Sequence, residues 1–181
     1  YRADIEAMLR TERFSGFNLL DLQDYPGQGT ALVGMLDAFM DSKGLIRPDE
    51  FRRFCDSVVL LLEQEKFCWT DAETYTVSVR IRNHGELDII DGKIRWVLRD
   101  GRNVVASGNL GIDSPHFSGL RSADATITIP LSGIRTPSRL DLDLFLDGTR
   151  VRNSYPVWVF SSERAVEIPA GAADPRRREA P

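Results

Sequence analysis

The densest cluster of polar side chains that could take part in chemistry lies near the amino terminus, at the end of the apolar run 16–22. They are Asp21, Gln23, Asp24, Tyr25 and Gln28. Carboxylate and amide groups can hydrogen-bond sugar hydroxyls, and an aromatic ring such as that of Tyr25 can stack on an apolar face. The alternative is structural: Asp24 caps a turn, and Asp21 pairs with an arginine. The residues alone leave both interpretations open.

Asp21 and Asp24 could also be considered as a pair of glycosidase carboxylates. Retaining enzymes hold the two carboxyl groups ~5–5.5 Å apart and inverting enzymes ~6.5–9.5 Å apart. A spacing of three residues at the end of a strand can meet either range, so this spacing does not decide between them.

Other catalytic and cofactor patterns are missing or incomplete in the sequence. The stretch 26–30 (Pro-Gly-Gln-Gly-Thr) lacks the lysine of a phosphate-binding loop and is typical of a turn into a helix. His84 and His116 lack the spacing of metal ligands. We therefore predict no catalytic residue, no metal and no cofactor. Cys55 and Cys68 have apolar neighbours, which favours buried free thiols, with a disulfide between them as the alternative.

The first 64 residues show the pattern of an α/β fold. A helix is predicted over 3–10, a strand buried on both faces over 16–22, and a helix from Thr30 to Gly44. A further helix opens at Pro48 and extends through the apolar residues of 51–62. A single buried strand has no neighbour for its hydrogen bonds, which indicates that this part belongs to a larger fold.

After Lys66 the apolar residues alternate with polar ones, a pattern typical of half-buried strands. Asp100-Gly101 and Asp147-Gly148 are typical hairpin turns. The strands number about seven, which predicts an antiparallel, immunoglobulin-like β-sandwich over 65–161. The last residues, 162–181, are rich in Ala, Pro and Arg and are predicted to be a linker or a disordered tail.

Composition and charge argue against two classes of partner. The formal net charge is −4, and acidic and basic residues are mixed along the chain, so we expect neither nucleic acid nor a membrane surface as a partner. No apolar run approaches the ~20 residues needed to cross a bilayer. The one basic run, 176–178, is interpreted as part of a solvated tail.

The stretch 16–34, GFNLLDLQDYPGQGTALVG, resembles bacterial enzymes of glycoside hydrolase family 2, the β-galactosidase-like and β-glucuronidase-like proteins. Residues 36–44 and 67–70 continue the resemblance. It implies that 1–64 are the carboxyl-terminal remnant of a (β/α)8 glycosidase barrel. The expected fold class is thus an α+β fragment: the terminal strand–helix unit of a barrel, followed by an immunoglobulin-like β-sandwich.

The resemblance also implies a function. The parent would be a retaining exo-β-glycosidase, and its two catalytic glutamates would lie upstream of Tyr1, so this chain alone would be inactive. Asp21, Gln23, Asp24 and Tyr25 would be candidate substrate-binding residues. The implied partners are a carbohydrate substrate and the rest of the barrel, and the implied location is periplasmic or secreted. The alternative is a non-catalytic β-sandwich that binds carbohydrate or acts as a structural spacer.

Overall fold

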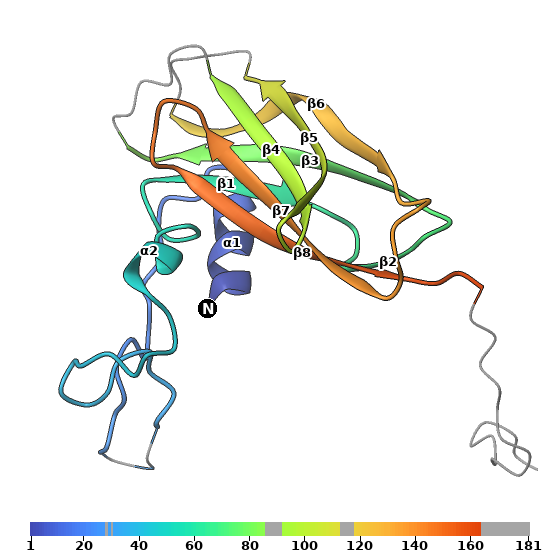
Figure 1. Ribbon diagram of the computed structural model, residues 1–181. Helices are drawn as coiled ribbons and strands as arrows, with labels where there is room; N and C mark the ends of the chain where they lie inside the picture. The colour runs from blue at the N-terminus through green and yellow to red at the C-terminus, as the bar shows by residue number, and fades with distance from the viewer. Residues whose placement is uncertain (28, 30, 86–91, 113–117, 164–181) are drawn as a thin grey trace, which may run out of the picture.

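A computed structural model describes residues 1–27, 29, 31–85, 92–112 and 118–163, and these residues form an almost entirely β structure (Figure 1). Two helices occur in this part of the chain, α1 (Arg2–Arg10) and α2 (Pro48–Phe51). The strands are β1 (Val58–Glu63), β2 (Cys68–Thr70), β3 (Thr74–Asn83), β4 (Lys93–Asp100), β5 (Asn103–Gly111), β6 (Gly119–Pro130), β7 (Ser138–Leu146) and β8 (Arg152–Phe160).

The strands form two sheets that face each other across one apolar core. One sheet has the order β1-β3-β6, and the other has the order β2-β8-β7-β4-β5. Neighbouring strands are antiparallel except β2 and β8, which are parallel. Alternate residues of the long strands point into the core, where Tyr75, Ile81, Leu98, Leu142 and Val157 are buried. The predicted hairpin turns at Gly101 and Gly148 join β4 to β5 and β7 to β8, each glycine having positive φ.

The predicted strand–helix unit of a barrel is wrong. Residues 16–22 form no strand, and the side chain of Leu20 is 80% exposed. Residues 31–44 contain turns and isolated bridges in place of a helix. Phe17 and Leu19 pack against a small core while Leu20 points outward, so the apolar run marks a segment lying over a surface rather than a strand inside a parallel sheet.

The helix predicted to extend from Pro48 to residue 62 is also wrong, because it ends at Phe51 and the chain continues as β1. The run Val58–Leu62 is continuously apolar because β1 is buried on both faces. Val58, Leu60 and Leu62 enter the core between the sheets, whereas Val59 and Leu61 face the opposite way. A strand of this kind has no alternating pattern and cannot be distinguished by periodicity from a buried helix.

The outward face of β1 is covered by α1 and by the segment around α2. A second core forms there from Ile5, Leu9, Phe54, Val59 and Leu61. The helix predicted over 3–10 is confirmed as α1, and its residues Ile5 and Leu9, one turn apart, form its buried stripe. Burial on both faces therefore makes β1 the shared element of the two cores.

A buried polar network fixes α1 to the sandwich. The Glu6 carboxylate is 4% exposed and accepts hydrogen bonds from Arg2 and Arg10 of its own helix, each at 2.9 Å. Asn153 Nδ2 lies 3.3 Å from Glu6 Oε1 and donates to the Leu60 carbonyl at 2.8 Å. The network thus links α1 to β8 and β1, and it neutralises a carboxylate that would otherwise be costly to bury.

A second buried charge holds the carboxyl end of α1. Arg82 of β3 is 2% exposed, and its Nε donates to the Leu9 carbonyl at 2.7 Å. Its Nη2 donates to the carbonyl of Thr11. These carbonyls have no partner within the helix, and a cation at this end is favoured by the helix dipole.

Replacing Glu6 with alanine should lower the free energy of unfolding by about 3 kcal/mol, because the partly buried guanidinium groups of Arg2 and Arg10 and the buried Asn153 amide lose their common acceptor. The measurement is equilibrium unfolding in urea. Asp4→Ala is the control: Asp4 is an exposed residue of the same helix, and its loss should change stability by less than about 1 kcal/mol. Equal effects of the two substitutions would contradict the proposed importance of the network.

Candidate functional site

The four predicted substrate-binding residues lie in a long excursion between Leu19 and Ile46, both of which pack against the second core. We call residues 20–45 the arm, of which residues 28 and 30 lie outside the described part. In Figure 1 the arm projects away from the sandwich below α2. Its few regular contacts are isolated bridges that join Gln23 to Leu36, Tyr25 to Ala31, and Leu36 to Ser42.

Asp24 is the buried centre of the arm. Its side chain is 8% exposed, and Oδ1 accepts hydrogen bonds from the Gly34 amide and from Lys43 Nζ, both at 2.9 Å. Lys43 also donates to Asp24 Oδ2 at 2.9 Å and to the Gly34 carbonyl at 3.0 Å. One ammonium group therefore joins three parts of the arm that are distant in sequence.

The hydrogen bond from Lys43 holds the pKa of the Asp24 carboxyl below its ordinary value of 3.8. The bond from the Gly34 amide acts in the same direction, and burial opposes both. A carboxylate bound in this way is ionised and fully engaged, so Asp24 is suited to holding the arm together and not to transferring protons. Of the two interpretations of Asp24, these contacts favour the structural one.

Close backbone packing accompanies this ion pair. A Cβ atom placed on Gly34 would lie 2.2 Å from the carbonyl carbon of Gln23 and 2.4 Å from the Asp24 nitrogen. Only glycine lets the two backbone segments approach this closely. The Gly34 amide can then reach the Asp24 carboxylate.

The other three predicted residues do not converge on Asp24. Asp21 has a left-handed backbone, with φ of 62°, and its carbonyl accepts a hydrogen bond from the Tyr1 hydroxyl at 2.6 Å. Gln23 contributes its backbone to the bridge with Leu36. Tyr25 is 54% exposed. The side chains of Gln23 and Tyr25 form no hydrogen bond with another described residue. A role for them in sugar binding stays a prediction.

Sequence reasoning missed Lys43, although this residue organises the arm. Lys43 lies 19 positions after Asp24, and no spacing rule connects an aspartate in a turn with a lysine at that distance. The only available signal was a pair of glycines: Gly34 lies where two backbone segments pack closely, and Gly44 has a left-handed backbone directly after Lys43.

The described residues contain no group of three or more His, Cys, Asp or Glu side chains placed to hold a metal ion. Within the same residues, no helix has the length and apolar character required to cross a membrane. Cys55 and Cys68 are free thiols. Burial raises the pKa of the half-buried Cys55 thiol, whereas Cys68 is exposed, because in β2 it is Trp69 that turns inward; the prediction that both cysteines are buried is wrong for Cys68.

Comparisons with known proteins give one family and several weak structural matches. Residues 73–161, the stretch that holds β3 to β8, match a family model described as "Domain of unknown function (DUF8488)". Comparison with curated proteins gives no match.

The solved structures that resemble the chain include a β-glucosidase from Listeria innocua in complex with glucose. It shares 14% identity at a TM-score of 0.39, over 57% of this chain and 16% of the β-glucosidase. The same enzyme in complex with gluconolactone gives 13% identity and a TM-score of 0.37. AvmM, which catalyses macrocyclization in alchivemycin A biosynthesis, gives 12% identity and a TM-score of 0.32, over 62% of this chain and 93% of AvmM. The chain is thus weakly similar to part of a β-glucosidase and spans about a sixth of its length.

The ion pair in the arm predicts a pH dependence. A carboxyl whose pKa is lowered by folding stabilises the folded arm above the ordinary pKa of 3.8, and this contribution is lost as the pH falls through the lower folded value. The NMR shift of the Gly34 amide should therefore titrate with a midpoint below 3.8. In Lys43→Met the midpoint should move upward, since the main cause of the lowering is gone and burial remains. Identical midpoints in the two proteins would show that Lys43 does not hold the carboxylate.

Proposed function

We propose that this chain is a non-catalytic β-sandwich module of a larger glycosidase, and that the arm packs against the catalytic part of that enzyme. The choice of a glycosidase is supported by the resemblance of residues 16–44 to family 2 enzymes. The finer assignment, a retaining exo-β-glycosidase, has the same support. In this proposal the sandwich is a structural spacer that positions the catalytic domain.

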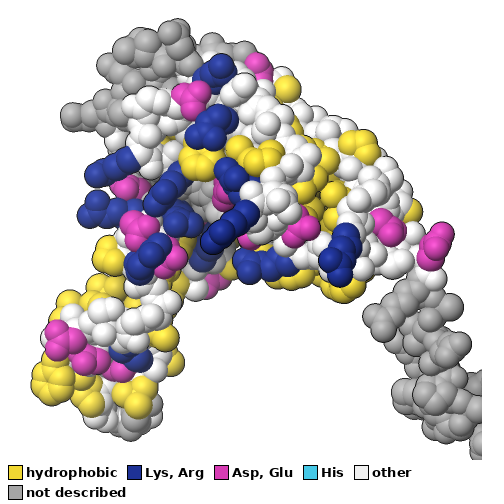
Figure 2. Space-filling model, in the orientation of Figure 1, with side chains coloured by type: hydrophobic (Ala, Val, Ile, Leu, Met, Phe, Trp, Pro, Cys, Tyr) yellow, Lys and Arg dark blue, Asp and Glu magenta, His cyan; other side chains and the backbone are white. Residues whose placement is uncertain are grey.

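The exposed apolar side chains of the arm are the observation that carries the proposal. Phe39 is 86% exposed, Leu20 80% and Leu45 69%. The remaining exposed apolar residues of the arm are Leu22, Tyr25, Leu32, Val33 and Met40. Figure 2 shows apolar side chains gathered on the arm. None of the described residues of the arm belongs to either core. Clusters of this kind are typical of a surface that another protein domain covers.

The sandwich has an apolar core of its own. Its core is complete, since strands from both sheets contribute fully buried side chains, and the second core already covers the outer face of β1. Of the thirteen exposed large apolar residues in the described part of the chain, eight lie in the arm, and the others, such as Phe67 and Val104, are scattered over the rest of the molecule. The buried Asp24–Lys43 pair supports the same view, because it gives the arm a defined backbone on which the apolar side chains are displayed.

A carbohydrate-binding sandwich is the second candidate. Phe67 is 58% exposed and Phe160 is 46% exposed, both near the pair of strands β2 and β8. Trp158 lies two residues before Phe160 and therefore on the same face of β8. Aromatic side chains along one sheet edge could stack on sugar rings, so binding of a soluble β-glucan to this face would favour this second function.

The apolar arm predicts association of the isolated chain. The 181-residue protein should bind an exposed-hydrophobe dye and self-associate in sedimentation experiments. The double variant Val33→Ser/Phe39→Ser should lose most of the dye signal, because it removes two large apolar surfaces from the arm. Its matched control is Val104→Ser/Phe160→Ser on the sandwich, where Val104 is 56% exposed.

The proposed function is tested by expressing the complete reading frame that contains this chain. We expect a glycosidase domain in the same polypeptide, and slower hydrogen exchange of the arm amides there than in the 181-residue chain. The arm double variant should restore fast exchange. A reading frame without a glycosidase domain, or an arm that exchanges equally in both proteins, would refute the proposal.

A further inference from the structure

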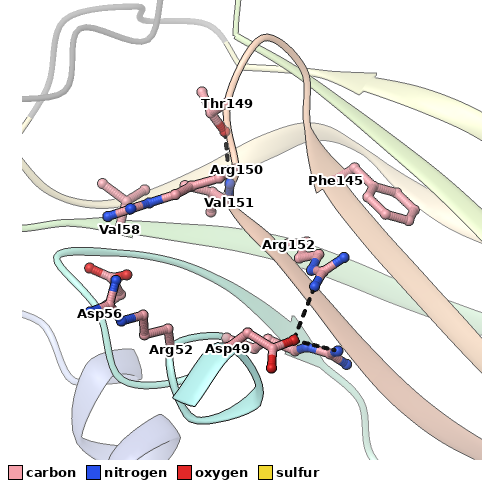
Figure 3. A pocket seen from close by; sticks show the side chains of 10 residues that line it. Asp49, Arg52, Asp56, Val58, Phe145, Thr149, Arg150, Val151 and Arg152 are labelled. Carbon is pink, nitrogen blue, oxygen red and sulfur yellow. Dashed lines mark hydrogen bonds and ion pairs between the residues drawn. The ribbon is translucent and has the colours of Figure 1, made fainter. Parts of the chain in front are cut away.

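We propose that a pocket between α2 and the β7–β8 turn is a binding site for a phosphate or sulfate group carried on a small polar molecule. The pocket has a volume of about 470 Å³. Its charged lining consists of Arg52, Arg53, Arg150, Arg152, Asp49 and Asp56. Figure 3 shows these side chains, which come from two parts of the chain about 100 residues apart. The proposal does not depend on the arm or on the function proposed for it.

The charge of the pocket is positive. Four arginines and two aspartates give a formal charge of 4 − 2 = +2 in the lining, although the whole chain carries −4. Figure 2 shows Lys and Arg side chains gathered where the arm meets the sandwich. A local excess of cations within an acidic protein attracts anions to this place and not to the surface in general.

Asp49 is already engaged and does not neutralise the whole pocket. Its Oδ2 lies 3.3 Å from Arg152 and 3.8 Å from Arg53, and its Oδ1 lies 3.2 Å from Arg47. A dashed line in Figure 3 marks the contact between Asp49 and Arg152. Three guanidinium groups thus share one carboxylate, which holds Arg53 and Arg152 in place and leaves them with donors to spare.

Arg52 and Arg150 are the two cations available to a bound anion. No carboxylate of the described residues forms an ion pair with either, although Asp56 also lines the pocket. Asp56 Oδ1 instead accepts hydrogen bonds from the amide and the hydroxyl of Ser57, at 2.7 and 3.3 Å. A guanidinium group matches the geometry of a tetrahedral oxyanion, to which it can donate two parallel hydrogen bonds.

Arg53, which lines the pocket, also carries an unpaired polar atom. Its Nε is buried and has no hydrogen-bond partner among the described residues. Buried donors are nearly always paired in folded proteins, because an unpaired one loses its hydration without compensation. Because this Nε is closed to solvent, an anion in the pocket would reach it only if the Arg53 side chain moved.

The size and walls of the pocket indicate what carries the anion. Val58, Val151 and Phe145 provide apolar surface beside the arginines. The volume lies within the range of about 300–1,000 Å³ that is typical of small-molecule sites and exceeds what a lone phosphate or sulfate ion would fill. A monosaccharide phosphate or sulfate ester fits this combination of positive charge, volume and apolar lining.

Isothermal titration calorimetry of the 181-residue chain tests the proposal. The probes are inorganic phosphate, inorganic sulfate, glucose 6-phosphate, glucose 6-sulfate and uncharged glucose. We expect one site per chain for the two esters, weaker binding of the free ions, and no binding of glucose. Binding of phosphate-bearing but not sulfate-bearing probes, or the reverse, identifies which anion the site selects.

Substitutions distinguish binding in the pocket from non-specific electrostatic attraction of anions to the protein. Arg52→Gln and Arg150→Gln should each weaken binding of the preferred ester about tenfold, since each removes a charge-assisted hydrogen bond. Arg135→Gln is the matched control: Arg135 is exposed and precedes β7, at the opposite end of that strand from Arg150. Asp56→Asn should strengthen binding by raising the positive charge.

The fold of each variant is checked by thermal unfolding. Arg52 and Arg150 are exposed, so their replacement should leave the unfolding temperature unchanged. The proposal is overturned if no probe binds the unsubstituted chain, or if Arg135→Gln weakens binding as much as Arg150→Gln does.

Discussion

The buried carboxylate of Glu6 attaches α1 to the sandwich, and the position of the segment before β1 depends on it. It joins two arginines of α1 to Asn153 and Tyr155 of β8, with the Leu60 carbonyl of β1 in the same network. A carboxylate buried this deeply is tolerated only with such partners. Because α1 covers the outer face of β1, the network fixes the second core, and the second core in turn fixes both ends of the arm at Leu19 and Ile46.

The sandwich and the arm are held by different forces. The sandwich depends on apolar burial from two sheets, whereas the arm is organised by one ion pair between Asp24 and Lys43 and by a glycine that permits close backbone packing. The arm consequently displays large apolar side chains instead of burying them. Apolar residues without a core of their own are the physical basis for proposing that the arm packs against another domain.

The predictions succeeded where local pattern and tertiary environment agree. The helix at 3–10, the alternating strands after Lys66 and the two Asp-Gly hairpins follow from periodicity and turn chemistry, and α1 and the strands β3 to β8 confirm them. They failed where apolar runs lacked alternation. The run 58–62 predicts part of a helix and the run 16–22 a buried strand, because composition alone does not reveal which face of a segment meets a partner.

The sequence by itself determined the strands with period 2 and the tight turns, because these depend on neighbouring residues. The tertiary structure alone decided that β1 serves two cores, that Asp24 pairs with Lys43, and that Arg52 and Arg150 line one pocket. These contacts join residues from 19 to nearly 100 positions apart. Their energy depends on burial and distance in space, which no local pattern encodes.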